Sequence, residues 1–223
     1  SLVPTLIMTI LNDPRGERYD FSRVEKIVYG GAAMLPSQIQ EVCRRLSCQM
    51  EIAYGSTETC CISILTSTDH QQVLEGILPE EKLASVGRCL PGIQVRVEGE
   101  DGQALAANEI GELLVKSPFL YEGYSAVSAP RALTADGYHH TGDIGYVDDD
   151  GYLYIVDRKH DMIVCGGENI YPKEIEEFLY THPSISDVQV IGVPSKRYGE
   201  EIMACIVLKP GETSTEEEIK EFV

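Results

Sequence analysis

The feature that most constrains the fold is a strand, a glycine turn, a helix and a second strand near the start of the chain. VEKIVY at 24–29 and QMEIAY at 49–54 are short apolar runs of strand length. Between them, SQIQEVCRRL places Ile39, Val42 and Leu46 on one helical face, with Ser37 as the expected N-cap. Two strands joined by a helix pair in parallel. The first part of the chain is therefore predicted to be α/β.

The pattern changes twice after this unit. From Ser85 to Asp157 short alternating runs and tight turns predict a small antiparallel β subdomain. From Arg158 onward two helical patterns and two strand patterns predict a compact α+β unit, its last helix opened by a capping box at Ser214 and Glu217. We therefore expect an α/β plus α+β protein with domains at 1–157 (an α/β part at 1–84 and a β subdomain at 85–157) and 158–223.

Composition excludes several classes of partner. The net charge of −18 argues against nucleic acid and anionic membranes, which need a basic surface, although a local phosphate site or Mg²⁺ is compatible with it. No apolar run approaches the roughly 20 residues of a membrane span. The seven cysteines include no C-x-x-C pair, which favours reduced thiols and an intracellular protein. A zinc site with His139 and His140 is disfavoured because the ligand spacing is wrong.

Two polar motifs follow the predicted parallel strands, where ligands of such sheets bind. GGA at 30–32 lets a backbone approach a flat ring or a phosphate, or is simply a tight turn. YGSTE at 54–58 offers the ring of Tyr54, the hydroxyl of Thr57 and the carboxylate of Glu58, which is a hard oxygen ligand suited to Mg²⁺. An ordinary polar turn is the alternative for this motif.

A second group of motifs lies at 141–167. TGD places Asp143 just before an expected strand, where a carboxylate could accept two hydrogen bonds from a cis-diol such as that of ribose. DDDG at 148–151 lacks the ligand spacing of a calcium loop and is read as a hairpin turn. Arg158 follows that hairpin, so it could converge with Asp143 on one ligand. Gly166 and Gly167 supply a side-chain-free loop, and Pro172 fits the first position of a helix.

The order of these motifs resembles the adenylate-forming (AMP-binding) superfamily over essentially the whole chain. GGA, YGSTE, GEL, TGD and the run from DRKHDMI to GGENIYPKEIE carry the likeness, and the last run resembles fatty acyl-CoA synthetases. The resemblance implies an enzyme that activates a carboxylic acid with Mg·ATP to an acyl-adenylate and transfers the acyl group to CoA. It also implies a large N-terminal domain followed by a small, mobile C-terminal domain.

The resemblance assigns roles to residues that match the family motifs. Gly31 and Ala32 would pack against the adenine and the acyl end, and Tyr54 would lie on the other face of the adenine. Gly55 would also belong to the cofactor-binding residues. Thr57 would contact the α-phosphate, and Glu58 the Mg²⁺. Asp143 and Arg158 would hold the ribose hydroxyls, and Gly166 and Gly167 would enter the site for thioester formation. His160 stands at the hinge position, where the family usually has Asp or Lys, so the domain rotation is expected to respond to pH.

The sequence departs from the family pattern in two ways. The phosphate loop with its lysine and the C-terminal catalytic lysine are both missing, so this chain is expected to be a fragment that is inactive alone. Acyl transfer to a carrier protein and a non-catalytic nucleotide-binding or interaction module stay open as alternatives. The compartment is expected to be the mitochondrial matrix or the cytoplasm, without a choice between them.

Overall fold

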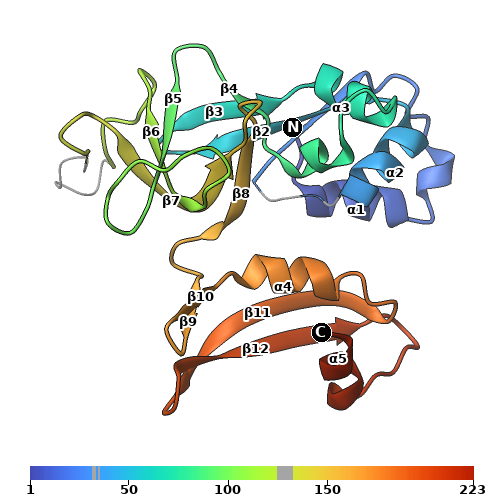
Figure 1. Ribbon diagram of the computed structural model, residues 1–223. Helices are drawn as coiled ribbons and strands as arrows, with labels where there is room; N and C mark the ends of the chain where they lie inside the picture. The colour runs from blue at the N-terminus through green and yellow to red at the C-terminus, as the bar shows by residue number, and fades with distance from the viewer. Residues whose placement is uncertain (32–33, 35, 125–132) are drawn as a thin grey trace. The chain divides into compact units, whose positions relative to one another are not determined.

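The computed structural model of this chain describes residues 1–31, 34, 36–124 and 133–223 (Figure 1). These residues form two compact units. Unit 1 contains Ser1–Thr141 and Gly145–Ile155, and unit 2 contains Gly142–Ile144 and Val156–Val223. None of the helices in the described ranges is long and apolar enough to cross a bilayer. The boundary expected at 157/158 stays a prediction.

The first sheet of unit 1 has the order β1-β2-β3-β4. β1 and β2 pair in parallel, so the strand–helix–strand prediction is confirmed, whereas β3 and β4 join antiparallel. Its elements and their neighbours are α1 (Pro4–Asn12), η1 (Gly16–Arg18), β1 (Lys26–Tyr29), α2 (Pro36–Leu46), β2 (Gln49–Ser56), β3 (Cys60–Leu65), α3 (Ser67–Leu74), η2 (Glu80–Ala84) and β4 (Arg88–Cys89).

The second sheet has the order β5-β6-β7-β8, and β5 pairs antiparallel with β6, as expected for the β subdomain. Its strands are β5 (Gln94–Glu98), β6 (Gly111–Lys116), β7 (His139–Val147) and β8 (Leu153–Arg158). Leu113, Val115 and Leu153 are fully buried in the core of this region. DDDG forms the turn between β7 and β8, as predicted.

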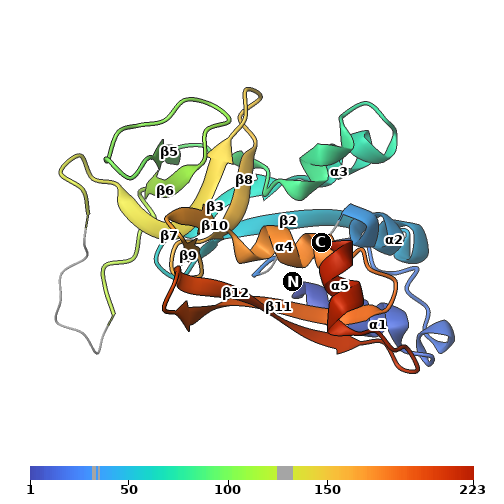
Figure 2. The same cartoon turned by 60° about the horizontal axis from the view of Figure 1, so that its bottom comes forward.

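Unit 2 contains a sheet of order β10-β9-β12-β11. The helix α4 runs alongside β11 in Figures 1 and 2, and the two elements are in contact. Leu179 of α4 is buried with Ile185 and Val188 of β11. The elements of unit 2 are β9 (Ile163–Cys165), β10 (Glu168–Ile170), α4 (Pro172–Leu179), β11 (Ile185–Ser195), β12 (Gly199–Leu208) and α5 (Glu216–Phe222).

Two helix starts differ from the sequence prediction, by two positions in α2 and by one in α5. α2 begins at Pro36, so Ser37 lies inside the helix and cannot be its N-cap. The capping box of α5 uses Thr215 and Glu218, because Thr215 has the extended backbone of an N-cap and accepts from the Glu218 amide. Ser214 instead donates to the Glu218 carboxylate at 3.2 Å.

Candidate nucleotide-binding residues

The turn between β2 and β3 holds the residues of the YGSTE motif in a fixed shape. Gly55 is required there, since a Cβ at this position would lie 1.8 Å from the Cys60 carbonyl oxygen. The buried hydroxyl of Thr59 accepts from the Ser56 amide at 3.0 Å and closes the turn. Thr57 is exposed at the tip, where its hydroxyl can reach a ligand. The turn that carries Thr57 and Glu58 is therefore closed by a hydrogen bond and by close backbone packing.

Glu58 is half-buried and held from two directions. Its amide donates to Ser56 Oγ at 3.2 Å, and its carbonyl accepts from the Tyr121 amide at 2.8 Å. Its carboxylate accepts from the Tyr124 hydroxyl. Hydrogen bonds from the Ser56 side chain and from Tyr124 lower the pKa of Glu58, so its carboxylate is ionised at neutral pH.

An ionised carboxylate of this kind fits Mg²⁺, which commonly uses one or two protein carboxylates and keeps its remaining positions for water and phosphate oxygens. Among the residues that the structure describes, no group of three or more His, Cys, Asp or Glu side chains is arranged to hold a metal ion.

The GGA and YGSTE motifs lie at the same edge of the first sheet. β1 and β2 run parallel with Tyr29 opposite Ile52, so Gly30 and Gly31 leave β1 where Tyr54 lies near the end of β2. A Cβ at Gly30 would lie 2.6 Å from the Ala53 carbonyl oxygen, which shows how closely the two segments approach. Ala32, expected beside Gly31, lies outside the described residues.

The carboxylate of Asp143 and the guanidinium of Arg158, which the sequence analysis expected to converge on one ligand, form an ion pair with each other. Asp143 lies inside β7, not before a strand, and its Oδ1 accepts from Arg158 Nε at 2.8 Å. The side chain of Asp143 is 8% exposed and that of Arg158 is 65% exposed. The amide of Lys159 donates to the Gly142 carbonyl at 2.8 Å and holds the two segments together. A buried acceptor is thus paired with a guanidinium that reaches solvent.

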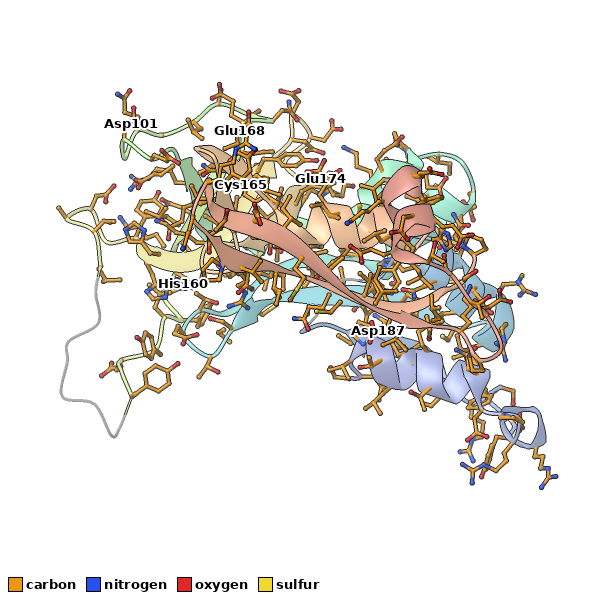
Figure 3. The ribbon with its side chains drawn as sticks, turned by 90° about the horizontal axis from the view of Figure 1, so that it is seen from below. Asp101, His160, Cys165, Glu168, Glu174 and Asp187 are labelled. Carbon is orange, nitrogen blue, oxygen red and sulfur yellow. The ribbon has the colours of Figure 1, made fainter. Side chains whose placement is uncertain are left out.

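The predicted hinge and glycine loop lie further along unit 2. His160 is exposed in the turn after β8, where the amides of Asp161 and Met162 donate to the Arg158 carbonyl. Gly166 and Gly167 form the turn of the β9–β10 hairpin, which replaces the simple loop expected for CGGENIYP. Figure 3 labels Cys165 and Glu168, the register partners on the two sides of this turn.

Two contributors escaped the sequence analysis. Tyr124 is 66 positions from Glu58 along the chain, so no local pattern connects them. Asp157 is buried, and its carboxylate accepts from the Lys173 amide at 3.1 Å at the start of α4, a helix without an N-cap side chain. The Asp that precedes Arg158 in DRKHD was visible in the sequence, but its partner was not.

Comparison with known proteins agrees with the family resemblance of the motifs. The AMP-binding enzyme family matches residues 1–125, and the AMP-binding enzyme C-terminal domain matches residues 174–223. The mitochondrial medium-chain acyl-CoA ligase ACSF2 of Bos taurus is 38% identical, over 98% of this chain and 35% of the relative. The medium/long-chain-fatty-acid–CoA ligase FadD8 of Mycobacterium tuberculosis is 35% identical, over 93% of this chain and 35% of its own length.

Solved structures of similar enzymes also match the fold of this chain. The amide bond synthetase McbA of Marinactinospora thermotolerans aligns with a TM-score of 0.85 and 31% identity, over 99% of this chain and 44% of that protein. The o-succinylbenzoate CoA synthetase of Bacillus subtilis, in complex with ATP and magnesium, aligns with a TM-score of 0.79 and 31% identity, over 99% of this chain and 43% of that one. The chain thus spans about a third to under half of the proteins that it matches. It belongs to the adenylate-forming AMP-binding enzyme family, with the fold class that its sequence predicted.

Proposed function

We propose that this chain supplies nucleotide-binding residues of an acid–thiol ligase that activates a fatty acid with Mg·ATP and transfers the acyl group to CoA. The observation that carries the proposal is the pairing of Asp143 with Arg158 at 2.8 Å. This pair stands at the positions of the family motif for the ribose. The turn that carries Thr57 and Glu58 supports the proposed function independently.

The proposed role of Asp143 follows from its surroundings. A carboxylate that is 8% exposed keeps a fixed direction, and it can accept from the hydroxyls of a ribose. The paired guanidinium balances its charge and retains N–H donors for the same sugar. Gly31 and Ala32 would pack against the adenine and the acyl end, with Tyr54 on the other face of the adenine, in the arrangement that the family implies. Gly55 would also belong to the cofactor-binding residues.

The phosphate end is proposed to meet Thr57 and Glu58. The hydroxyl of Thr57 would donate to the α-phosphate, and the Glu58 carboxylate would bind Mg²⁺. When bound, Mg²⁺ would neutralise charge on the phosphates. The contribution of this chain is to hold the acceptor carboxylate and the donor hydroxyl in place before the substrate arrives. Such positioning and charge stabilisation supply most of the rate enhancement in reactions of this kind.

The second half-reaction is assigned to unit 2. We propose that His160 is the hinge for rotation of the C-terminal domain and that Gly166 and Gly167 bring a narrow backbone to the thioester-forming site. A lysine-bearing phosphate loop and a C-terminal catalytic lysine, which the family implies, do not occur in this sequence. We therefore expect no acyl-dependent exchange of ATP with pyrophosphate by this chain alone.

The names of relatives narrow the substrate class. The relatives described above are ligases of medium-chain and medium/long-chain acids, so a fatty acid is proposed as the acyl donor and CoA as the acceptor. Because the ACSF2 relatives are mitochondrial, we propose an intracellular compartment, the mitochondrial matrix or the cytoplasm.

The test is calorimetric binding of a non-hydrolysable acyl-adenylate analogue to this chain and to Asp143→Ala. A lost hydrogen bond to a charged acceptor costs roughly 1.5–3 kcal/mol, so binding should weaken at least about tenfold. A second analogue without ribose hydroxyls should bind both proteins equally, because it cannot use the carboxylate.

The matched control is Asp101→Ala, which removes an exposed carboxylate from another turn. It should leave binding of both analogues unchanged. Equal weakening by Asp143→Ala for the two analogues would show that Asp143 does not hold the ribose. No loss for either analogue would exclude Asp143 from the site altogether.

A further inference from the structure

The segment after β6 makes two separate contacts with Glu58. The amide of Tyr121 donates to the Glu58 carbonyl at 2.8 Å, and the hydroxyl of Tyr124 donates to Glu58 Oε1. One contact fixes the backbone of the residue, and the other fixes a carboxylate oxygen. A single short segment therefore controls both the position and the direction of this side chain.

The Tyr124 ring is supported from behind. It packs edge-on against Tyr121 with ring centroids 5.3 Å apart, and Tyr121 packs edge-on against His139 of β7 at 5.9 Å. Aromatic pairs in this geometry are favourable beyond the area that they bury. The ring contacts from Tyr124 to Tyr121 and from Tyr121 to His139 on β7 thus hold the Tyr124 hydroxyl beside Glu58.

This support is not explained by folding stability. The Tyr124 side chain is half-exposed, so its hydrogen bond competes with water and adds little to the stability of unit 1. The bond is therefore better explained by the orientation that it gives to the Glu58 carboxylate.

We infer that Tyr124 is a positioning residue that orients the Glu58 carboxylate for a divalent cation bound with nucleotide. The hydrogen bond occupies Oε1 and fixes the plane of the carboxylate, so the group does not have to be ordered when the cation binds. This inference rests on the proposed metal-binding role of Glu58, and it adds a residue that the family motifs did not assign.

The experiment measures the dissociation constant of ATP for the full 223-residue chain by calorimetry, with and without Mg²⁺. The ratio of the two constants reports the metal contribution. Four proteins are compared: the unmodified chain, Glu58→Gln, Tyr124→Phe and Tyr138→Phe. The last is the matched control, because it removes another phenol whose hydroxyl donates to Gln94 at 3.1 Å.

Mg²⁺ should tighten ATP binding to the unmodified chain, and Glu58→Gln should abolish this gain. Tyr124→Phe should reduce the gain by about three- to tenfold, because one hydrogen bond to a charged group at a partly exposed site is lost. Its metal-free ATP affinity should stay unchanged, which a general structural defect would not allow. Tyr138→Phe should behave like the unmodified chain.

The other outcomes separate the two ideas. If Glu58→Gln abolishes the gain and Tyr124→Phe retains it, the positioning role is wrong while the metal role of Glu58 stands. If Glu58→Gln retains the gain, Glu58 is not the metal ligand, and the inference about Tyr124 fails with it. Absence of ATP binding by the unmodified chain would overturn the proposed function and the inference together.

Discussion

Replacing Asp69 by Asn should loosen unit 1, because this buried carboxylate joins three elements. Asp69 is 3% exposed and lies in the first turn of α3. Its Oδ2 accepts from the amide and the hydroxyl of Thr66 at 3.0 and 2.5 Å. Its Oδ1 accepts from the buried Tyr152 hydroxyl at 2.8 Å and from Arg88 at 3.1 Å. Burial by itself would raise the pKa of Asp69, but these bonds outweigh it and lower that pKa.

The magnitude follows from the geometry of the amide. Asn keeps one acceptor oxygen, and its NH₂ group must face either the Thr66 donors or the pair from Tyr152 and Arg88. One lost bond to a charged acceptor with a buried partner costs roughly 1.5–3 kcal/mol. The second lost bond is local or, for the 57%-exposed Arg88, screened by solvent, and adds about 0.5 kcal/mol. We expect a total near 3 kcal/mol, or roughly a hundredfold in an equilibrium constant.

Hydrogen exchange followed by mass spectrometry can resolve this effect, because two units make a single unfolding midpoint ambiguous. Peptides covering 62–75 should exchange roughly a hundredfold faster in Asp69→Asn, provided that opening and closing are faster than exchange. Peptides covering β11 and β12 should not change. The matched control is Glu218→Gln, which alters the same capping-box position in the exposed helix α5.

Unchanged exchange at 62–75 in Asp69→Asn would refute the reasoning, since it would mean that the network contributes nothing to the stability of unit 1. Equal acceleration in both units would also refute it, because the bonds to Asp69 all come from unit 1.

Three further predictions use the same chain. Burial lowers the pKa of His70 from 6.5, and its ring is hydrogen-bonded to Thr66 and Tyr29, so the folded state favours neutral His70. The urea concentration at which unit 1 unfolds should therefore be highest above about pH 6.5 and should fall as the pH drops below that value. His70→Gln should make this dependence on pH weaker. Gly87→Ala should destabilise unit 1 by about 3 kcal/mol or more, because the new Cβ would lie 2.0 Å from the Ile64 carbonyl oxygen at φ +78. Gly92→Ala, with open space around its Cβ, should cost only the backbone strain of about 1–2 kcal/mol. Hydrogen exchange in peptides of unit 1 measures both effects. Asp157→Ala should destabilise the start of α4 by about 1–2 kcal/mol, because the acceptor for the Lys173 amide is lost. Hydrogen exchange should be faster in peptides covering 172–179 and unchanged in peptides covering 49–65. If α4 exchanges at the same rate in the variant and the unmodified chain, the bond to the Lys173 amide is dispensable.

Much of the local structure could be predicted from the sequence. The parallel pairing of β1 with β2, the hairpin at DDDG and the start of α4 at Pro172 follow from strand-length apolar runs, turn residues and proline geometry. α3 and β3 were not predicted. The first is short and polar, and the second follows its partner strand after a turn of only three residues, so neither shows a clear period.

The order of motifs predicted the residues of the candidate site, including a shared ligand for Asp143 and Arg158, whose side chains lie 2.8 Å apart. Which side chains support that site was decided by the tertiary structure alone. Tyr124 reaches Glu58 across 66 positions, and Tyr152 reaches Asp69 across 83. Local patterns can be read from the sequence because helices and strands place side chains on one face at fixed intervals along the chain. Such distant pairings depend on strand register and on where loops return, and these are settled only when the whole core packs.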